Sequence, residues 1–178
     1  MVSDRAKQAV EQIFVKAARE SMALGPGNAC EVRPLSAGGG EFPEGNLVVF
    51  TISSFLFRLL TIFHVQENPA TVGYFVRDGA KQSFSEIFSE VGNLCCGTMN
   101  RDLLRIAPHL GMSTPYTLGS KCVRYLDELK PGHVARFAII IDGAELLQAT
   151  LCFCEYAPVD FALDAPAEEQ ETGALELF

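Results

Sequence analysis

The stretch of residues 47–66 restricts the fold of this chain more than any other feature. It is rich in valine, isoleucine, phenylalanine and threonine, the residue types that β-strands favour. It is also longer than one average strand, and Ser53 and Ser54 interrupt it. We therefore predict two strands, at residues 47–52 and at about 55–66.

The same apolar stretch has a competing interpretation as a membrane span over residues 47–65. Arg58 lies near its centre, and a charge there costs about 2.5–3.5 kcal/mol on insertion. Ser53, Ser54 and His64 add further polar groups, so two buried strands explain the stretch better. The first residues form an amphipathic helical pattern with early charges, which is not typical of a signal peptide.

Asp142-Gly143 is the strongest turn signal in the chain. Such a pair favours a two-residue hairpin, here between strands at 134–141 and 144–156. Further strands are expected at 30–35 and 116–126. Because the strands come in hairpins and do not alternate regularly with helices, we predict an α/β (α+β) fold. We expect a largely antiparallel sheet with helices packed on one face, in a single domain.

Three helices are expected. The first covers residues 4–24, and the second opens at Asn68-Pro69, with Asn as N-cap and Pro in the first turn, and runs to about 77. The third begins near residue 82 and ends by Pro108, with a kink or an end near Asp102, which would otherwise fall on the apolar face.

The third helix divides into two faces when its residues are placed at about 100° each. The apolar face holds Phe84, Ile87, Phe88, Val91, Leu94 and Cys95, and the opposite face holds Glu86, Glu90, Asn93 and Gly97. We call these last four residues the polar stripe. A glycine inside a helix costs roughly 1 kcal/mol relative to alanine. Here it would leave the stripe low, so that another surface can approach closely.

The polar stripe could also be an ordinary solvated helix face. Neither Glu86 nor Glu90 has a lysine or arginine four residues later, so the stripe is not built for ion pairing along the helix. Glu86 has a second possible role, because its spacing from Ser83 is that of a capping box. Both roles of Glu86 stay open from the sequence.

The pattern Glu90-x-x-Asn93-x-x-x-Gly97 resembles the active-site helix of the CheC/CheX/FliY family of chemotaxis phosphatases. In that family an acidic residue or serine precedes the glutamate by four positions. Glu86 stands there, where aspartate or serine is usual. The resemblance extends more loosely over residues 9–156 through the order of elements. A single such motif makes the chain CheX-like.

The resemblance implies a phosphatase that removes the phosphoryl group from the aspartate of a CheY-like receiver domain. Glu90 and Asn93 would then be the catalytic residues, with Glu90 bound to the receiver's lysine and Asn93 orienting the attacking water. Glu86 and Gly97 would contact the partner. The protein would need no metal or cofactor of its own, since the receiver supplies Mg²⁺, and relatives suggest a possible homodimer. The alternative is a non-catalytic interaction module of the same fold that binds a signalling or flagellar-switch partner.

Six cysteines, at positions 30, 95, 96, 122, 152 and 154, include no C-x-x-C pair. Free thiols in a cytoplasmic protein are the expected state. A third hypothesis makes Cys95 and Cys96 a thiol-based sensor. The three histidines are isolated in the sequence, which gives no metal-ligand spacing.

The charge distribution separates residues 1–158 from the end of the chain. The formal net charge is −8, and residues 159–178 contain six acidic residues and no basic ones. An acidic chain argues against a nucleic-acid partner, which usually calls for a basic patch. We predict a folded domain at 1–158 and a mobile acidic tail at 159–178.

Overall fold

The computed structural model describes residues 1–36, 42–77 and 81–163. The helices are α1 (Asp4–Met22), α2 (Pro69–Phe75) and α3 (Phe84–Leu104), together with a 3₁₀ helix, η1 (Ser120–Leu129). The strands are β1 (Cys30–Leu35), β2 (Asn46–Ser53), β3 (Phe57–Val65), β4 (Gly111–Met112), β5 (Tyr116–Gly119), β6 (His133–Ile141) and β7 (Ala144–Glu155).

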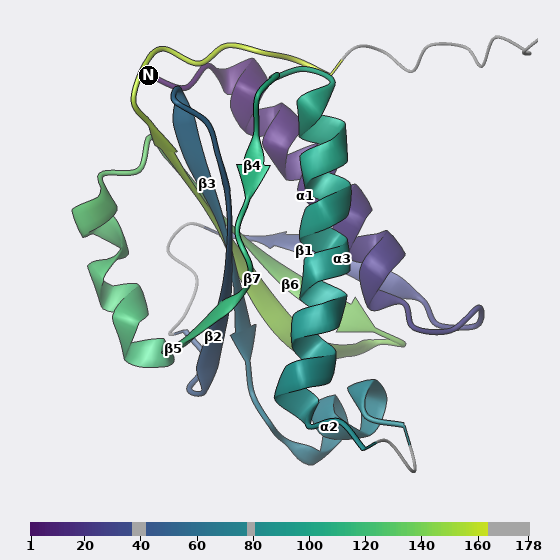
Figure 1. Ribbon diagram of the computed structural model, residues 1–178. Helices are drawn as coiled ribbons and strands as arrows, with labels where there is room; N and C mark the ends of the chain where they lie inside the picture. The colour runs from purple at the N-terminus through teal and green to yellow at the C-terminus, as the bar shows by residue number, and fades with distance from the viewer. Residues whose placement is uncertain (37–41, 78–80, 164–178) are drawn as a thin grey trace, which may run out of the picture.

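The strands form one sheet in the order β1-β6-β7-β3-β2-β4, with β5 also paired to β2. Every pair of these strands is antiparallel. Helices α1 and α3 pack side by side on one face of the sheet, and α2 lies near the start of α3 (Figure 1). The predicted class, an antiparallel sheet with helices on one face, is confirmed.

Both predicted hairpins are present. Strands β2 and β3 pair from Asn46 opposite Val65 to Ser53 opposite Arg58, so the chain reverses just after Ser53. Asp142 and Gly143 have φ values of 49° and 84°, the left-handed values that a tight two-residue hairpin requires. The Asp142 carboxylate also accepts a hydrogen bond from the amide of Ala29, 2.8 Å away, and so ties the turn to the chain before β1.

The main core lies between the sheet and the helices α1 and α3, and phenylalanine rings fill its centre. Phe63 of β3 contacts Phe14 of α1, Phe50 of β2 and Phe88 of α3, with ring centroids 6.3, 6.1 and 5.7 Å apart. Aromatic pairs at such distances stabilise the fold beyond the area that they bury. Both helices are therefore anchored to the same point of the sheet.

Helices α2 and α3 begin with the N-cap residues that the sequence predicted. The Ser83 and Asn68 side chains accept hydrogen bonds from the first turns of α3 and α2. Helix α3 ends at Leu104, shortly after Asp102, as predicted. Asp102 pairs with Lys16 of α1 at 2.8 Å, which explains how a carboxylate can lie on the side of α3 that faces its neighbour.

One predicted strand is mostly wrong. Of residues 116–126, only Tyr116–Gly119 form a strand, and the 3₁₀ helix η1 begins at Ser120. Val123 and Leu126 pack on the second face of the sheet, against Leu47, Val49 and Leu60. Their spacing of three residues puts both side chains on one side of a 3₁₀ helix, whereas a strand would point them to opposite sides.

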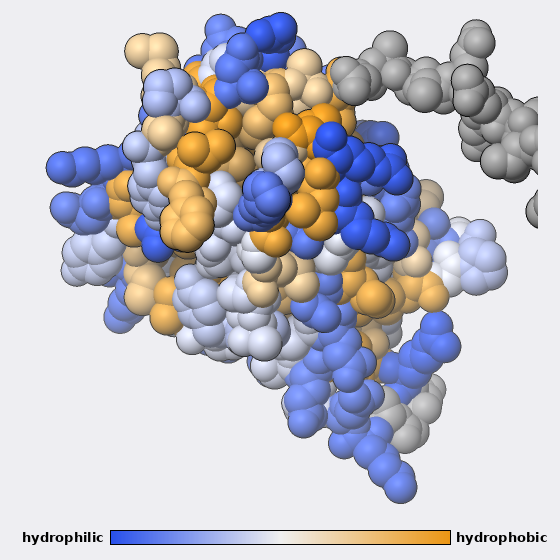
Figure 2. Space-filling model, turned by 45° about the horizontal axis from the view of Figure 1, so that its top comes forward, coloured by the Kyte–Doolittle hydropathy of each residue, from blue (hydrophilic) through white to orange (hydrophobic). Residues whose placement is uncertain are grey.

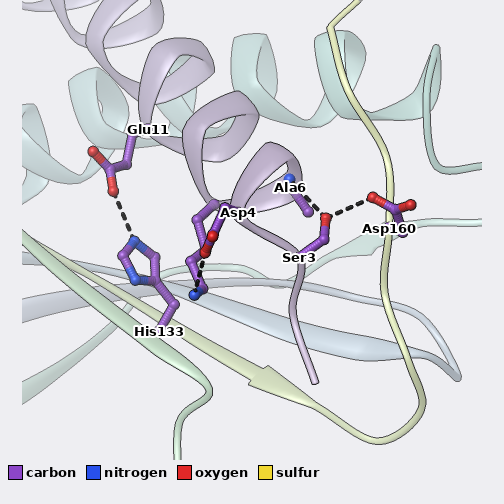
Figure 3. Close-up of polar contacts among 7 residues, drawn as sticks. Ser3, Asp4, Ala6, Glu11, His133 and Asp160 are labelled. Atoms are coloured by element: carbon purple, nitrogen blue, oxygen red, sulfur yellow. Dashed lines mark hydrogen bonds and ion pairs between the residues drawn. The ribbon is translucent and has the colours of Figure 1, made fainter.

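The predicted tail starts too early. Val159 is buried, and the ring of Phe161 packs against Phe153. Asp160 accepts a hydrogen bond from the Ser3 hydroxyl at 2.6 Å (Figure 3). It also pairs with Arg5. This segment belongs to the folded domain, and the rest of the predicted tail, residues 164–178, lies outside the described residues.

Polar contacts also fix the beginning of α1. The Ser3 hydroxyl accepts a hydrogen bond from the amide of Ala6, which caps the helix. Further along α1, Glu11 Oε1 lies 2.7 Å from Nε2 of His133 on β6 (Figure 3). At this end of the molecule, which Figure 2 turns toward the viewer, apolar side chains lie among charged ones.

Within the described ranges, no helix is long and apolar enough to cross a membrane.

Two glycines of α3 provide a matched test of the packing. A methyl group at Gly92 would lie 2.7 and 2.8 Å from ring atoms of Phe50, whereas one at Gly97 would meet nothing within 4 Å. We expect Gly92→Ala to lower the free energy of unfolding by about 1–3 kcal/mol through overpacking. Gly97→Ala should raise it by roughly 0.5–1 kcal/mol through helix propensity. Urea denaturation of both variants measures the difference, and equal effects would contradict the packing of α3.

Stability should also fall in acid because of His64. Its ring is buried, lies 2.8 Å from the Thr150 hydroxyl and stacks on Phe42. Burial, with a smaller effect of the Arg136 cation, lowers the pKa of His64 from 6.5 to about 4. The folded state thus favours the neutral ring, so this contribution is complete above about pH 6.5 and is lost as the pH falls toward 4.

The full loss amounts to roughly 3 kcal/mol of unfolding free energy. We expect urea denaturation curves at pH 7 and pH 4.5 to differ less for His64→Gln than for the wild type. His109→Gln, at an exposed position, serves as the control and should keep the wild-type difference. If His64→Gln also keeps it, the acid sensitivity does not come from His64.

Candidate functional site

Helix α3 presents the polar stripe on the outside of the molecule. Glu86, Glu90 and Asn93 are exposed and Gly97 is half-buried. The opposite side of the helix is buried in the core, where it contributes Phe84, Phe88, Val91, Gly92, Cys95, Cys96, Met99 and Leu103. The core contacts therefore determine the direction in which the stripe points.

Glu86 is occupied by the helix cap. Its carboxylate accepts hydrogen bonds from the backbone amide and the hydroxyl of Ser83, both at 2.7 Å. These two bonds lower the pKa of Glu86. Of the two roles that the sequence left open, the cap is present in the structure, and contact with a partner stays a prediction.

Glu90 is held by a residue that the sequence did not single out. Gln82 Nε2 donates a hydrogen bond to Glu90 Oε1 at 3.0 Å. Gln82 lies directly before Ser83, the N-cap of α3, and the bond places its side chain beside the first turns of the helix. A spacing of eight residues across a helix start gives no periodic signal, so only the structure reveals the pair. The bond limits the directions in which the Glu90 carboxylate can point.

Asn93 differs from both glutamates. It is exposed, and no other part of the chain that the structure describes forms a hydrogen bond with its side chain. An amide has one acceptor oxygen and two N–H donors. All of this capacity faces solvent and is available to a partner.

An open hollow of about 670 Å³ lies next to Asn93 and Gly97. Its lining comes from α1 (Glu20, Ser21), from the chain after α1 (Ala23, Leu24), from α3 (Asn93, Leu94, Gly97, Thr98, Arg101) and from β4 (Met112). Leu94 corrects the predicted apolar face, because its side chain is 65% exposed and lies on the outer side of α3. The helix turns it away from the core, and Gly92 and Cys96 take the inner positions.

A second hollow, of about 520 Å³, runs along α1, and Glu11, Lys16, Arg19 and Pro34 contribute to its lining. It includes no residue of the polar stripe. Within residues 1–36, 42–77 and 81–163, no three histidine, cysteine, aspartate or glutamate side chains come together in a group that could hold a metal ion.

No model of a known protein family matches this sequence, and no curated protein matches it. Solved structures do. CheX from Desulfovibrio desulfuricans is 14% identical with a TM-score of 0.56, and the match covers 82% of this chain and 98% of that one. The CheX–CheY–BeF₃–Mg²⁺ complex from Borrelia burgdorferi matches at 12% identity and a TM-score of 0.57, over 84% of this chain and 97% of that one. The protein has the CheC/CheX fold.

A CheC-like superfamily protein from a Shewanella species extends the comparison, at 10% identity, a TM-score of 0.52 and coverage of 85% of this chain and 98% of that one. The CheC/CheX fold thus accounts for nearly the whole length of each of these relatives. At such low identity the likeness concerns the fold alone. The roles of Glu90, Asn93, Glu86 and Gly97 stay predictions.

Cys95 and Cys96 lie on the inner side of α3. Both side chains are buried, and burial raises the pKa of Cys95 well above its usual value and that of Cys96 to about 12. A thiol reacts as the thiolate, so neither is prepared for redox chemistry. This placement disfavours the thiol-sensor hypothesis.

We expect a thiol reagent at pH 8 to modify exposed Cys122 in the native protein and to leave Cys95 and Cys96 unmodified, because the reagent needs an accessible thiolate. Peptide mapping after brief labelling identifies the modified cysteines, and urea-unfolded protein should react at all six. Rapid native labelling at Cys95 or Cys96 would restore the sensor hypothesis. Cys122→Ser is the control that removes the exposed thiol.

Proposed function

We propose that this protein accelerates hydrolysis of the aspartyl phosphate on a CheY-like receiver domain, as a CheX-like phosphatase in chemotaxis signalling. The observation that carries the proposal is Asn93, whose amide is exposed and has no hydrogen-bond partner among the described residues. It lies one helical turn from Glu90, on a helix of a protein with the CheC/CheX fold.

The chemistry requires little of the phosphatase itself. A water oxygen attacks the phosphorus in line with the bond to the aspartate, that bond breaks, and the aspartate leaves as a carboxylate. Both water protons remain with the product, which is released as H₂PO₄⁻. The receiver provides the Mg²⁺ and the lysine that stabilise the developing charge. What remains for a partner is to position the water.

Asn93 suits this task because an amide stays neutral at every working pH. Its oxygen can accept a hydrogen bond from the attacking water, while its NH₂ group donates to an oxygen of the receiver or its phosphate. Since nothing in the described chain competes for these groups, the amide can adopt the orientation that the complex requires.

Glu90 is assigned to the ion pair with the receiver's lysine. Three residues along a helix correspond to a rise of about 4.5 Å, so Glu90 and Asn93 can reach the same partner. The hydrogen bond from Gln82 occupies one carboxylate oxygen of Glu90, and the exposed carboxylate retains capacity for the lysine. Glu90 thereby fixes the register in which Asn93 meets the phosphoryl group.

The second candidate is a binding module of the same fold that docks on a receiver without catalysis. The capping role of Glu86 favours this candidate. Glu86 replaces the aspartate or serine that is usual in the motif, and its carboxylate is already bound to the N-cap residue of α3. A CheY-like partner is common to both candidates. A homodimer stays a prediction.

Asn93→Ala separates the two candidates. If Asn93 orients the water, we expect about a hundredfold loss of the accelerated phosphate release, equal to roughly 2.7 kcal/mol of activation free energy, while binding to the phosphorylated receiver persists. Glu90→Ala should mainly weaken binding, because it removes the ion pair. Phosphate release is measured with Mg²⁺-loaded, phosphorylated CheY-type receivers, and binding with BeF₃-treated receivers.

Ser85→Ala is the matched control, an exposed position of α3 outside the polar stripe. It should leave both measurements unchanged. Binding without accelerated release by the wild type would support the binding module. If no receiver binds and none loses phosphate faster, both candidates are excluded.

A further inference from the structure

We infer that Leu94 and the hollow over Gly97 receive an apolar side chain of the receiver domain, and that Leu94 sets the affinity for it. The inference rests on the proposed function and adds to it a residue that the family motif does not include. The four residues of the polar stripe explain how a partner would be oriented. Of these four, only Glu90 is assigned a contribution to affinity, through a single ion pair at an exposed site, where such pairs contribute little.

The exposure of Leu94 is the first observation. The side chain is 65% exposed, directly after Asn93 in the sequence. Single exposed leucines are ordinary on protein surfaces, but this one is not isolated. Leu24 and Met112, both half-buried, line the same hollow from two other segments, so the surface beside the polar stripe is apolar over more than one element.

The position of the hollow is the second observation. Helix α3 contacts both α1 and β4. The hollow is lined from the end of α1, from β4 and from α3 between Asn93 and Arg101, so it extends over the surface of α3. It does so at Gly97, where an added methyl group would meet nothing within 4 Å. The missing side chain keeps the surface of the helix low at this point.

Asn93 connects the hollow to the proposed chemistry. Its side chain lines the hollow, so a partner that brings an atom within hydrogen-bond distance of the amide also covers the space above Gly97. An empty apolar space in a closed complex would lose the contacts that drive association. The receiver surface next to its phosphorylated aspartate is thus expected to fill the hollow.

The charges around the hollow indicate an apolar occupant. Arg101 and Glu20 line it and have opposite charges, and Arg101 already donates a hydrogen bond to the Thr98 hydroxyl at 3.0 Å. The hollow therefore has no excess charge that would select an anion or a cation. Leu94, Leu24 and Met112 favour an aliphatic or aromatic side chain instead.

The test compares Leu94→Ala, Leu94→Met and Leu104→Ala in the receiver assay. Leu104 is an exposed leucine of α3, 41% accessible, that does not line the hollow. We expect Leu94→Ala to raise KM for the phosphorylated receiver about tenfold, equal to about 1.4 kcal/mol, with kcat unchanged. Leu94→Met should restore most of the affinity, since methionine can fill the same space, and Leu104→Ala should behave as wild type.

The outcomes distinguish this inference from the proposed function. If the wild type neither binds nor dephosphorylates any receiver, the proposed function fails and the inference with it. If the wild type is active and Leu94→Ala has the wild-type KM, only the inference is overturned. If the wild type binds without catalysis, the Kd replaces KM, and a tenfold increase in Leu94→Ala supports the inference.

Two further results would overturn the inference. A lower kcat with unchanged KM would assign Leu94 to the chemical step. Dissociation of a dimer by Leu94→Ala, measured by sedimentation, with unchanged KM would show that the hollow holds a second copy of this chain. Because Leu94 is exposed, the variants should keep the wild-type thermal unfolding temperature, which confirms that they are folded.

Discussion

The packing of α3 against the phenylalanine core is the constraint on which the rest of this structure depends. Phe88 contacts Phe63 of the sheet, and Gly92 brings the helix backbone against the ring of Phe50. These contacts determine the rotation of the helix about its own axis. Once the buried face of the helix is determined, Asn93 and Gly97 must lie on its outer face.

The polar stripe consists of residues with different degrees of freedom. Glu86 is bound into the capping box, Glu90 is held by Gln82, and Asn93 has no partner in the described chain. Along the stripe, the side chains thus change from ones that bind within the fold to one whose hydrogen-bonding groups are available to a partner. Such an order suits a docking helix, since the groups that fix its geometry lie at one end and the group that must adapt to a partner lies further along.

The second face of the sheet explains why residues 47–66 are almost continuously apolar. Strand β3 is buried at nearly every position, because α1 and α3 cover one face and η1 covers part of the other with Val123 and Leu126. A strand buried on both faces does not alternate between polar and apolar residues. Thr61 and His64 are the buried polar residues of β3, and His64 is accommodated as a neutral ring beside Thr150.

The sequence alone determined the hairpins, the helix starts, the antiparallel class and the outward stripe of Glu86, Glu90, Asn93 and Gly97, because each depends on residues close together in the chain. It also predicted Leu94 on the apolar face of α3, residues 120–126 as part of a strand and Val159 as the start of a tail, and these were wrong. Each of these positions is decided by contacts between distant segments: the rotation of α3 on its core, the sheet face that Val123 covers, and the pairing of Asp160 with Ser3. The Gln82–Glu90 bond and the hollow over Gly97 likewise needed the three-dimensional structure. No local period or propensity indicates which side chains will meet across the start of a helix or between α1 and β4.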